Sequence, residues 1–239
     1  MCVDWRILHE REKAALQKEA RWLKRQGVRI IVDLSSGLNL YPTLRLLNNV
    51  PADYEASMAI WSEVLAKMEL MGARDLVFSR HRDPENNVTG EQANAGYWST
   101  LKDLAAQAAA RGVTLHLRVG PGKPPRNFAE AFHYLDPVNA PNLKLAIGTA
   151  MLGRQPLDNQ LLARMQGRVG IWLVAGQRAD IAGKVWDTHA PFHSLRDLRT
   201  TAQWMATAPA APQILDAVYG NQDEEYLDAV TLDQILKEP

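Results

Sequence analysis

One pattern recurs along this chain and limits what it can fold into: an amphipathic helix, a glycine that ends it, and a short apolar strand. The first three copies are helix 5–26 with Gly27 before VRIIVDLS, helix 53–71 with Gly72 before DLVFS, and helix 90–111 with Gly112 before VTLHLR. Strands that alternate with helices of this length pair in parallel, and right-handed crossovers place the helices outside the sheet. The sequence therefore predicts an α/β fold around a parallel sheet.

The second half of the chain continues the pattern. Helices are predicted over 127–136, 156–166, 194–207 and 231–237, and strands over 143–147, 169–175 and 213–218. An open doubly wound sheet is disfavoured because SSGLNLYP, after the first strand, lacks the G-x-G-x-x-G phosphate loop. The expected fold is a parallel (β/α) TIM-barrel-like domain, incomplete or divergent, since about six strands are recognisable where a barrel has eight. One missing strand would precede Met1, and another would lie within 176–193.

Length and charge narrow the function classes. With 239 residues the chain is expected to form one domain, 1–239, either alone or as part of a longer protein. Lys plus Arg number 27 and Asp plus Glu number 27, so no overall positive field favours a nucleic acid or an anionic membrane. Cys2 is the only cysteine and no apolar signal segment stands out, which indicates a cytoplasmic protein.

Three stretches carry a resemblance to a known family: KRQGVR before VDLS, AQAAARGVTLHLR, and NAPNLKLAIGTA. Over roughly residues 10–219 the chain resembles the xylose-isomerase-like TIM-barrel superfamily of sugar and sugar-phosphate isomerases and epimerases. The resemblance implies a barrel fold and a carbohydrate substrate. In active members of that superfamily, acidic residues and a histidine at strand ends hold one or more divalent metals.

The family's metal ligands are mostly missing here. The resemblance places a Glu where this chain has Arg118, and an Asp where it has Gly148 and Thr149. Strand 169–175 is not followed by the expected histidine, and Asp216 could take the place of the acid on the last strand. An Arg cannot replace a carboxylate ligand, because it has a fixed positive charge and no acceptor lone pair. No cofactor is therefore predicted, since a divalent metal would lack its expected ligands.

Residues just past each strand are the candidates for a site, because barrel active sites lie at the carboxyl ends of the strands. The polar and aromatic residues in these positions are Asp33, Asn39, Arg80, His81, Arg82, Arg118, Lys123, Arg178, Asp216 and Tyr219. The four arginines and the lysine could clamp the phosphate or carboxylate of a sugar acid, given the bidentate geometry of guanidinium. The alternative is a structural network in which these cations pair with Asp33, Asp83 and Asp216.

The histidines allow several interpretations. His81 is the best candidate for a general acid or base, because it titrates near neutral pH and follows a strand; a loop histidine bonded to Asp83 or Glu85 is the alternative. His116 alternates with core residues and is expected to be buried and hydrogen-bonded. The segment WDTHAPFH (186–193) could bind a metal, but capping of the following helix is preferred.

Two function classes remain. The first is an isomerase-, epimerase- or lyase-like enzyme that acts on a sugar or sugar acid by proton transfer, with His81 and either Asp33 or Asp216 as acid and base. The second is a non-catalytic carbohydrate-binding or scaffolding domain of a larger carbohydrate-active protein. The missing metal ligands favour the second, and the crowded polar strand ends favour the first. In both cases the expected partner is a small-molecule carbohydrate, with other domains of a longer chain or a homo-oligomer as protein partners.

Overall fold

The computed structural model describes residues 2–4, 11–35, 51–79, 90–120, 125–154, 158–179, 185–191, 198–208, 210–216 and 222–237. It divides into two compact units: Met1–Arg118 with Lys123–Lys144, and Val119–Gly122 with Leu145–Pro239. The single-domain organisation expected from the sequence stays a prediction.

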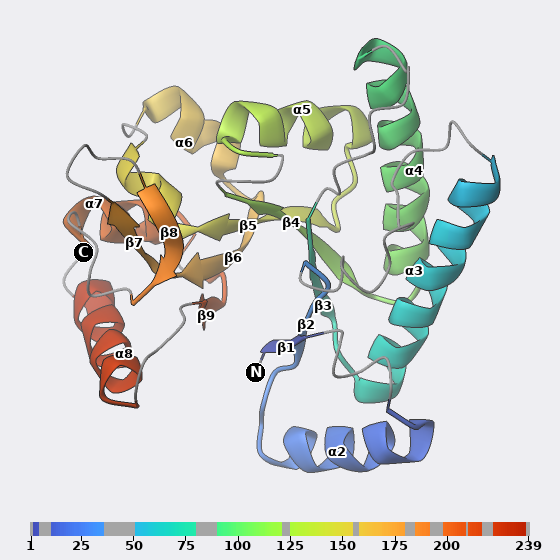
Figure 1. Cartoon of the computed structure of the whole chain (residues 1–239), viewed down its shortest axis with the longest axis horizontal. Helices are drawn as coiled ribbons and strands as arrows, with labels where there is room; N and C mark the ends of the chain where they lie inside the picture. The colour runs from blue at the N-terminus through green and yellow to red at the C-terminus, as the bar shows by residue number, and fades with distance from the viewer. Residues whose placement is uncertain are drawn as a thin grey trace. The chain divides into compact units, whose positions relative to one another are not determined.

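The first unit is built from parallel strands with a helix after each (Figure 1). Its elements are β1 (Cys2–Asp4), α2 (Lys13–Arg25), β2 (Ile31–Asp33), α3 (Pro51–Met71), β3 (Asp75–Phe78), α4 (Gly90–Ala110), β4 (Thr114–Val119) and α5 (Phe128–Val138). The strand order is β1-β2-β3-β4, and the pairings are parallel. The register aligns Val32, Leu76 and Leu115 across three strands, and all three side chains are fully buried.

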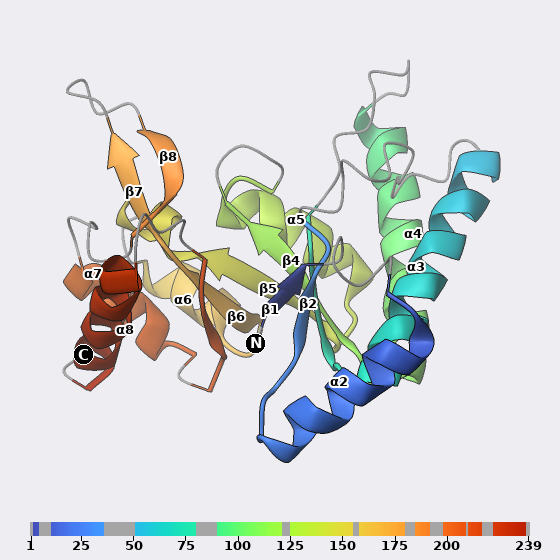
Figure 2. The ribbon, with the colours of Figure 1, turned by 60° about the horizontal axis from the view of Figure 1, so that its bottom comes forward.

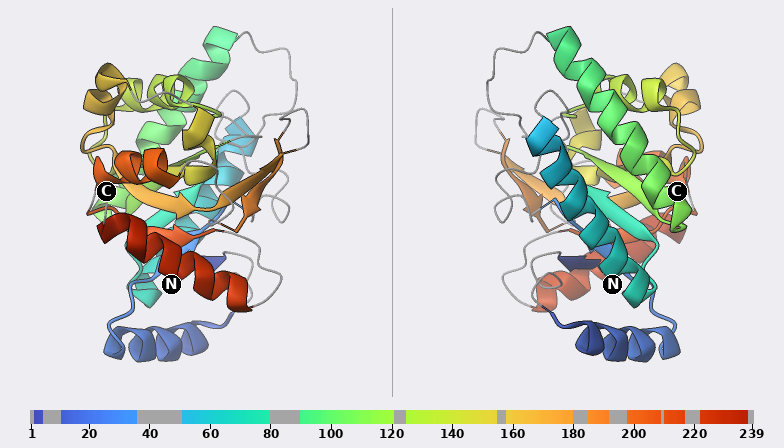
Figure 3. Two further views of the ribbon diagram at one scale, coloured as in Figure 1. Left: turned by 90° about the vertical axis from the view of Figure 1, so that its left-hand side faces the viewer. Right: turned by 90° about the vertical axis from the view of Figure 1, so that its right-hand side faces the viewer.

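Three helices of this unit pack against one another through side chains that the sequence pattern places on one side. Leu16, Ala20 and Leu23 form the buried side of α2, which contacts α3. Helices α3 and α4 lie side by side (Figure 3). Trp61 of α3 and Tyr97 of α4 are fully buried.

The glycines predicted to end the helices do so. Gly72 and Gly112 have positive φ values of 67° and 63°, a conformation that side chains with a Cβ rarely adopt. The residue after each glycine donates its backbone N–H to a carbonyl in the last turn, Ala73 to Met68 at 2.9 Å and Val113 to Ala108 at 2.9 Å. This geometry reverses the chain and sends it directly into the next strand.

The expectation that the first strand lies upstream of Met1 is wrong. Cys2–Asp4 forms β1, which pairs in parallel with β2 through Cys2↔Ile31, Val3↔Val32 and Asp4↔Asp33. The sequence signal was too short to find, because three residues between Met1 and Trp5 show no periodicity. Tertiary pairing with β2, and not local propensity, makes this segment a strand.

The second unit contains β5 (Leu143–Gly148, whose first two residues belong to the first unit), η2 (Thr149–Arg154), α6 (Asn159–Met165), β6 (Val169–Val174), β7 (Gly176–Ala179), β8 (Val185–Ala190), α7 (Leu198–Ala206), β9 (Gln213–Leu215) and α8 (Gln222–Lys237). Strands β5, β6 and β9 are adjacent and parallel. The six strands predicted from the sequence are thus all present. Helices α7 and α8 lie side by side (Figure 3).

Two details of this unit differ from the sequence interpretation. The strand expected within 176–193 exists, but as an antiparallel hairpin of β7 and β8 outside the parallel sheet (Figure 2). Asp187 and His189 lie inside β8 and not directly before α7, and His193 lies outside the described residues, so the expected capping of that helix stays a prediction. Helix α8 begins at Gln222 and not near 231. Its acidic first turn lacks the apolar periodicity on which the prediction relied, but acids in that turn suit the positive end of the helix dipole.

No helix in the described ranges is both long and apolar enough to cross a membrane.

Candidate functional site

Only part of the predicted site lies in the described residues. The side chains of Asp33, Arg118 and Asp216 are described, and Arg178 is placed only by its backbone in β7. The other predicted positions lie outside the described residues: Asn39, Arg80, His81, Arg82, Lys123 and Tyr219. Their roles stay predictions.

Asp33 and Arg118 meet at the carboxyl ends of their strands. Asp33 is the last residue of β2, and Arg118 is the last but one of β4. Arg118 Nη1 lies 3.6 Å from Asp33 Oδ2, and the two side chains are 21% and 17% exposed. The backbone N–H of Ser35 donates to Asp33 Oδ1 at 2.7 Å, which fixes the carboxylate. This ion pair is therefore half-buried and not sealed in the core.

Strand register explains why these two side chains are close. Asp33 pairs with Val77, and Val77 pairs with His116, so the three residues share one face of the sheet. Arg118 follows His116 by two residues and therefore lies on the same face. Apolar core residues lie on both faces: Val77 is fully buried on this one, and Leu115 and Leu117 are fully buried on the opposite one.

A second polar cluster lies on the same sheet, toward the amino ends of the strands. Asp75, the first residue of β3, accepts hydrogen bonds from Arg29 Nε at 2.8 Å and Arg29 Nη2 at 2.9 Å. His116 Nε2 lies 2.9 Å from Asp75 Oδ1. The Asp75 and His116 side chains are 3% and 2% exposed, whereas that of Arg29 is 59% exposed. His116 is thus buried and hydrogen-bonded, as the sequence predicted.

The charge states of this cluster follow from its surroundings. Burial by itself raises the pKa of Asp75, but the hydrogen bonds from His116 and Arg29 outweigh it and hold the pKa below its usual value. Burial lowers the pKa of His116 and outweighs the attraction of Asp75. The cluster is therefore a neutral imidazole that donates from Nε2 to an ionised carboxylate. Among the described residues, the buried Nδ1 of His116 has no hydrogen-bond partner.

In the second unit, Asp216 directly follows β9, and its backbone N–H donates to the Val174 carbonyl at 2.8 Å. Thr149 is fully buried, accepts from the Ala175 N–H at 2.9 Å and donates to the Ala175 carbonyl at 2.8 Å. This residue stands where the family resemblance places an acidic ligand. Its hydroxyl is instead hydrogen-bonded to the backbone of Ala175, the residue that follows β6.

Among the residues that the structure describes, the donor set does not fit a divalent metal. The Arg118 guanidinium stands at one expected ligand position, and the Thr149 hydroxyl is already paired at another. The described ranges contain no group of three or more His, Cys, Asp or Glu side chains that could hold a metal ion. We therefore assign no step of a reaction to a metal.

Sequence reasoning missed Asp75 and Arg29. Asp75 begins the strand DLVF, in which every residue is buried, and an acid in such a position requires a buried partner. That signal was present in the sequence. The identity of the partners was not, because Arg29 and His116 are 46 and 41 residues away and are brought close only by strand pairing.

Comparison with known proteins identifies the family. The model of the xylose isomerase-like TIM barrel matches residues 3–206. The chain therefore belongs to the xylose isomerase-like TIM barrel family, and its fold is the parallel TIM-barrel-like fold that the sequence predicted. No curated protein matches the chain.

Several solved structures are similar to it. A xylose isomerase domain protein from Planctomyces limnophilus is 16% identical, with 99% of this chain and 87% of that chain covered and a TM-score of 0.70. A D-psicose 3-epimerase from Clostridium cellulolyticum H10, solved with D-tagatose, is 11% identical, with 98% and 86% covered and a TM-score of 0.69. The IolI protein with a bound zinc atom is 12% identical, with 99% and 98% covered and a TM-score of 0.65. At these identities the likeness establishes the fold.

Proposed function

We propose that this protein is a sugar isomerase- or epimerase-like enzyme that acts on a sugar or sugar acid by proton transfer without the family's usual metal. The observation that carries the proposal is the half-buried pair of Asp33 and Arg118, 3.6 Å apart at strand ends. The site of a barrel enzyme lies at these ends. Structural neighbours named as epimerases of D-psicose and L-ribulose support the substrate class.

In this proposal Arg118 supplies the positive charge. Removal of a proton next to a sugar carbonyl leaves negative charge on the carbonyl oxygen, and a guanidinium held at that oxygen stabilises it. Asp33 or Asp216 accepts the proton, and His81 returns a proton to the opposite face of the carbon. Arg80, Arg82, Lys123 and Arg178 complete the anion clamp, and Asn39 and Tyr219 contact the sugar. The protein acts in the cytoplasm.

A second candidate function is carbohydrate binding without turnover. It is favoured by the same ion pair, because Asp33 and Arg118 neutralise one another and match the structural network that the sequence left open. The loss of two family ligands at Arg118 and Thr149 also fits a domain that has given up catalysis.

Isothermal titration with glucose 6-phosphate and glucuronate separates the two. In the proposed enzyme, binding weakens with salt, and Arg118→Ala reduces affinity by the equivalent of about 1.5–3 kcal/mol, the range of one charge-assisted hydrogen bond. Arg164→Ala on α6 makes the same change in net charge away from the strand ends, and should leave affinity unchanged. Binding of neutral sugars only, unaffected by Arg118→Ala, would favour the binding domain.

Turnover is followed by NMR in D2O, through loss of the substrate C–H signal from D-fructose, D-tagatose and the two anionic sugars. His81→Ala should keep ligand affinity and slow exchange by on the order of 10²–10⁴-fold. An equal loss of affinity in His81→Ala would assign that histidine a structural role. Metal analysis after dialysis should find less than one equivalent of Mn, Mg or Zn; tight stoichiometric metal that depends on Asp216 would contradict the proposal.

A further inference from the structure

Two helices carry the large apolar side chains that the described part of the chain exposes. Trp22 of α2 is 52% exposed, and Tyr226 and Leu227 of α8 are 73% and 46% exposed. Tyr, Trp and Arg are enriched at protein interfaces, and an apolar patch with a polar rim marks such a site. Neither helix contributes a residue to the Asp33 and Arg118 pair, so these surfaces need a separate explanation.

The exposed side of α2, called here the basic face, is formed by Lys18, Arg21, Trp22, Lys24 and Arg25. Lys18 lies one helical turn before Trp22 and Arg25 one turn after it, so the three side chains are neighbours. The four cations line a hollow of about 630 Å³. Glu19, the only acid within α2, forms an ion pair with Arg11. The basic face therefore presents net positive charge around one exposed indole.

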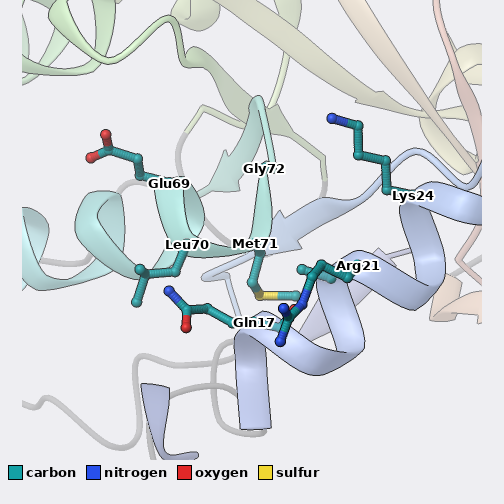
Figure 4. A pocket seen from close by; sticks show the side chains of 8 residues that line it. Gln17, Arg21, Lys24, Glu69, Leu70, Met71 and Gly72 are labelled. Atoms are coloured by element: carbon teal, nitrogen blue, oxygen red, sulfur yellow. The ribbon is translucent and has the colours of Figure 1, made fainter. Parts of the chain in front are cut away.

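A groove of about 400 Å³ adjoins the basic face, between α2 and the end of α3 (Figure 4). Arg21 and Lys24 line it from α2, and Leu70 and Met71 line it from α3. It also contains Glu69, its one acidic residue among those described. An apolar floor beside cations is suited to receive an apolar side chain that is flanked by carboxylates.

Helix α8 presents that combination. Asp223 and Glu225 are exposed in its first turn, and Asp223 lies one turn before Tyr226 and Leu227. Asp233 forms an ion pair with Lys237 at 2.6 Å. The negative charge that a partner could meet is therefore that of Asp223 and Glu225, at the amino end of the helix. Acids in the first turn also stabilise the helix itself. Helix stability does not account for the two exposed apolar side chains beside them. The set Asp223, Glu225, Tyr226 and Leu227 is called here the acidic face.

We propose that the basic face of one copy of this chain binds the acidic face of a second copy. The charges of the two helices are complementary, because α2 carries five Lys or Arg against one acid, and α8 carries five Asp or Glu against one Lys. The two helices have similar lengths, about 20 Å and about 24 Å at 1.5 Å per residue. The net charge of the whole chain is zero, so two copies do not repel each other at long range.

Sedimentation equilibrium over a wide concentration range tests the contact. The wild-type chain should self-associate, and the association should weaken as salt is added. Lys18→Glu with Arg21→Glu, or Asp223→Lys with Glu225→Lys, should each weaken self-association roughly a hundredfold, because like charges then face each other. Lys102→Glu with Arg164→Glu makes the same charge change as the α2 variant, on other helices, and should have no effect. Circular dichroism verifies that each variant is folded.

The decisive experiment mixes the two charge-reversed variants, one altered in α2 and the other in α8. Each folded variant alone should remain monomeric, and the equimolar mixture should associate, because every basic face then has an acidic partner again. Failure of the mixture to associate would overturn the proposal, as would a wild-type chain that stays monomeric. Loss of association in the α2 variant alone, or binding of RNA or anionic vesicles by a monomeric wild type, would show that the basic face has another partner.

Discussion

The same sheet of the first unit holds two acid–base pairs in opposite settings. Asp75 and His116, near the amino ends of the strands, are almost entirely buried, and the Asp75 carboxylate is bonded to both His116 and Arg29. Asp33 and Arg118, at the carboxyl ends, are 17% and 21% exposed and 3.6 Å apart. The residue types are similar, but the first cluster has exchanged water for fixed hydrogen bonds and the second has kept contact with solvent.

The structural role of the buried cluster and the binding role proposed for the second pair rest on this difference. A buried carboxylate whose oxygens are occupied cannot accept a proton from a ligand, but its loss leaves unpaired polar groups in the core. A half-buried pair contributes little to stability, because water competes for both partners. In a barrel, the amino ends of the strands serve stability and the carboxyl ends serve chemistry.

The largest effect is expected at Asp75. Asp75→Ala removes the acceptor of His116 and Arg29 together, and should lower the free energy of unfolding by about 3–5 kcal/mol, as for other broken buried pairs. Asp75→Asn keeps an oxygen for His116 and should cost less. Urea unfolding measures both. A loss below that of Asp33→Ala would remove the distinction between the two pairs.

The second-largest expected effect is that the free energy of unfolding depends on pH through His116 and Asp75. Both shifted groups have lowered pKa values in the folded state. As pH falls below the ordinary histidine value of 6.5, the unfolded chain takes up the His116 proton first, so stability decreases. The lowered pKa of Asp75 adds a further loss at more acidic pH. The slope from one histidine is at most about 1.4 kcal/mol per pH unit.

The matched control for this pH effect is His116→Gln, which can still donate to Asp75 but does not titrate. Urea midpoints measured from neutral pH to mildly acidic pH should fall less in this variant than in the wild type. Equal pH profiles would mean that the other histidines cause the loss, and that His116 is not the buried neutral group described above.

The contrast also shows what the sequence could predict. Helix and strand periodicity, with glycines at the helix ends, is local information, and it located six strands correctly. Segment Cys2–Asp4 became a strand through its pairing with β2, and β7 with β8 paired with each other outside the parallel sheet. These outcomes depend on tertiary contacts that no local pattern encodes.

The site was less predictable for the same reason. The alternation of His116 with core residues indicated that it is buried, but only the register of β2, β3 and β4 brings Arg29 to Asp75 and Arg118 to Asp33. Residues after strand ends can be named from sequence as candidates. Which of them form a pair, and whether that pair keeps contact with water, depends on strand register and burial.

The smallest effect is expected from the Asp33 and Arg118 pair itself. In a double-mutant cycle of Asp33→Asn and Arg118→Gln, the coupling free energy from urea unfolding should stay below about 1 kcal/mol and decrease with added salt, because both side chains are partly hydrated. The same Arg118→Gln change should still impair binding of an anionic sugar, since a ligand phosphate or carboxylate loses its charged partner. Coupling of several kcal/mol, insensitive to salt, would place this pair with the buried cluster as a structural element and would argue against the anion clamp.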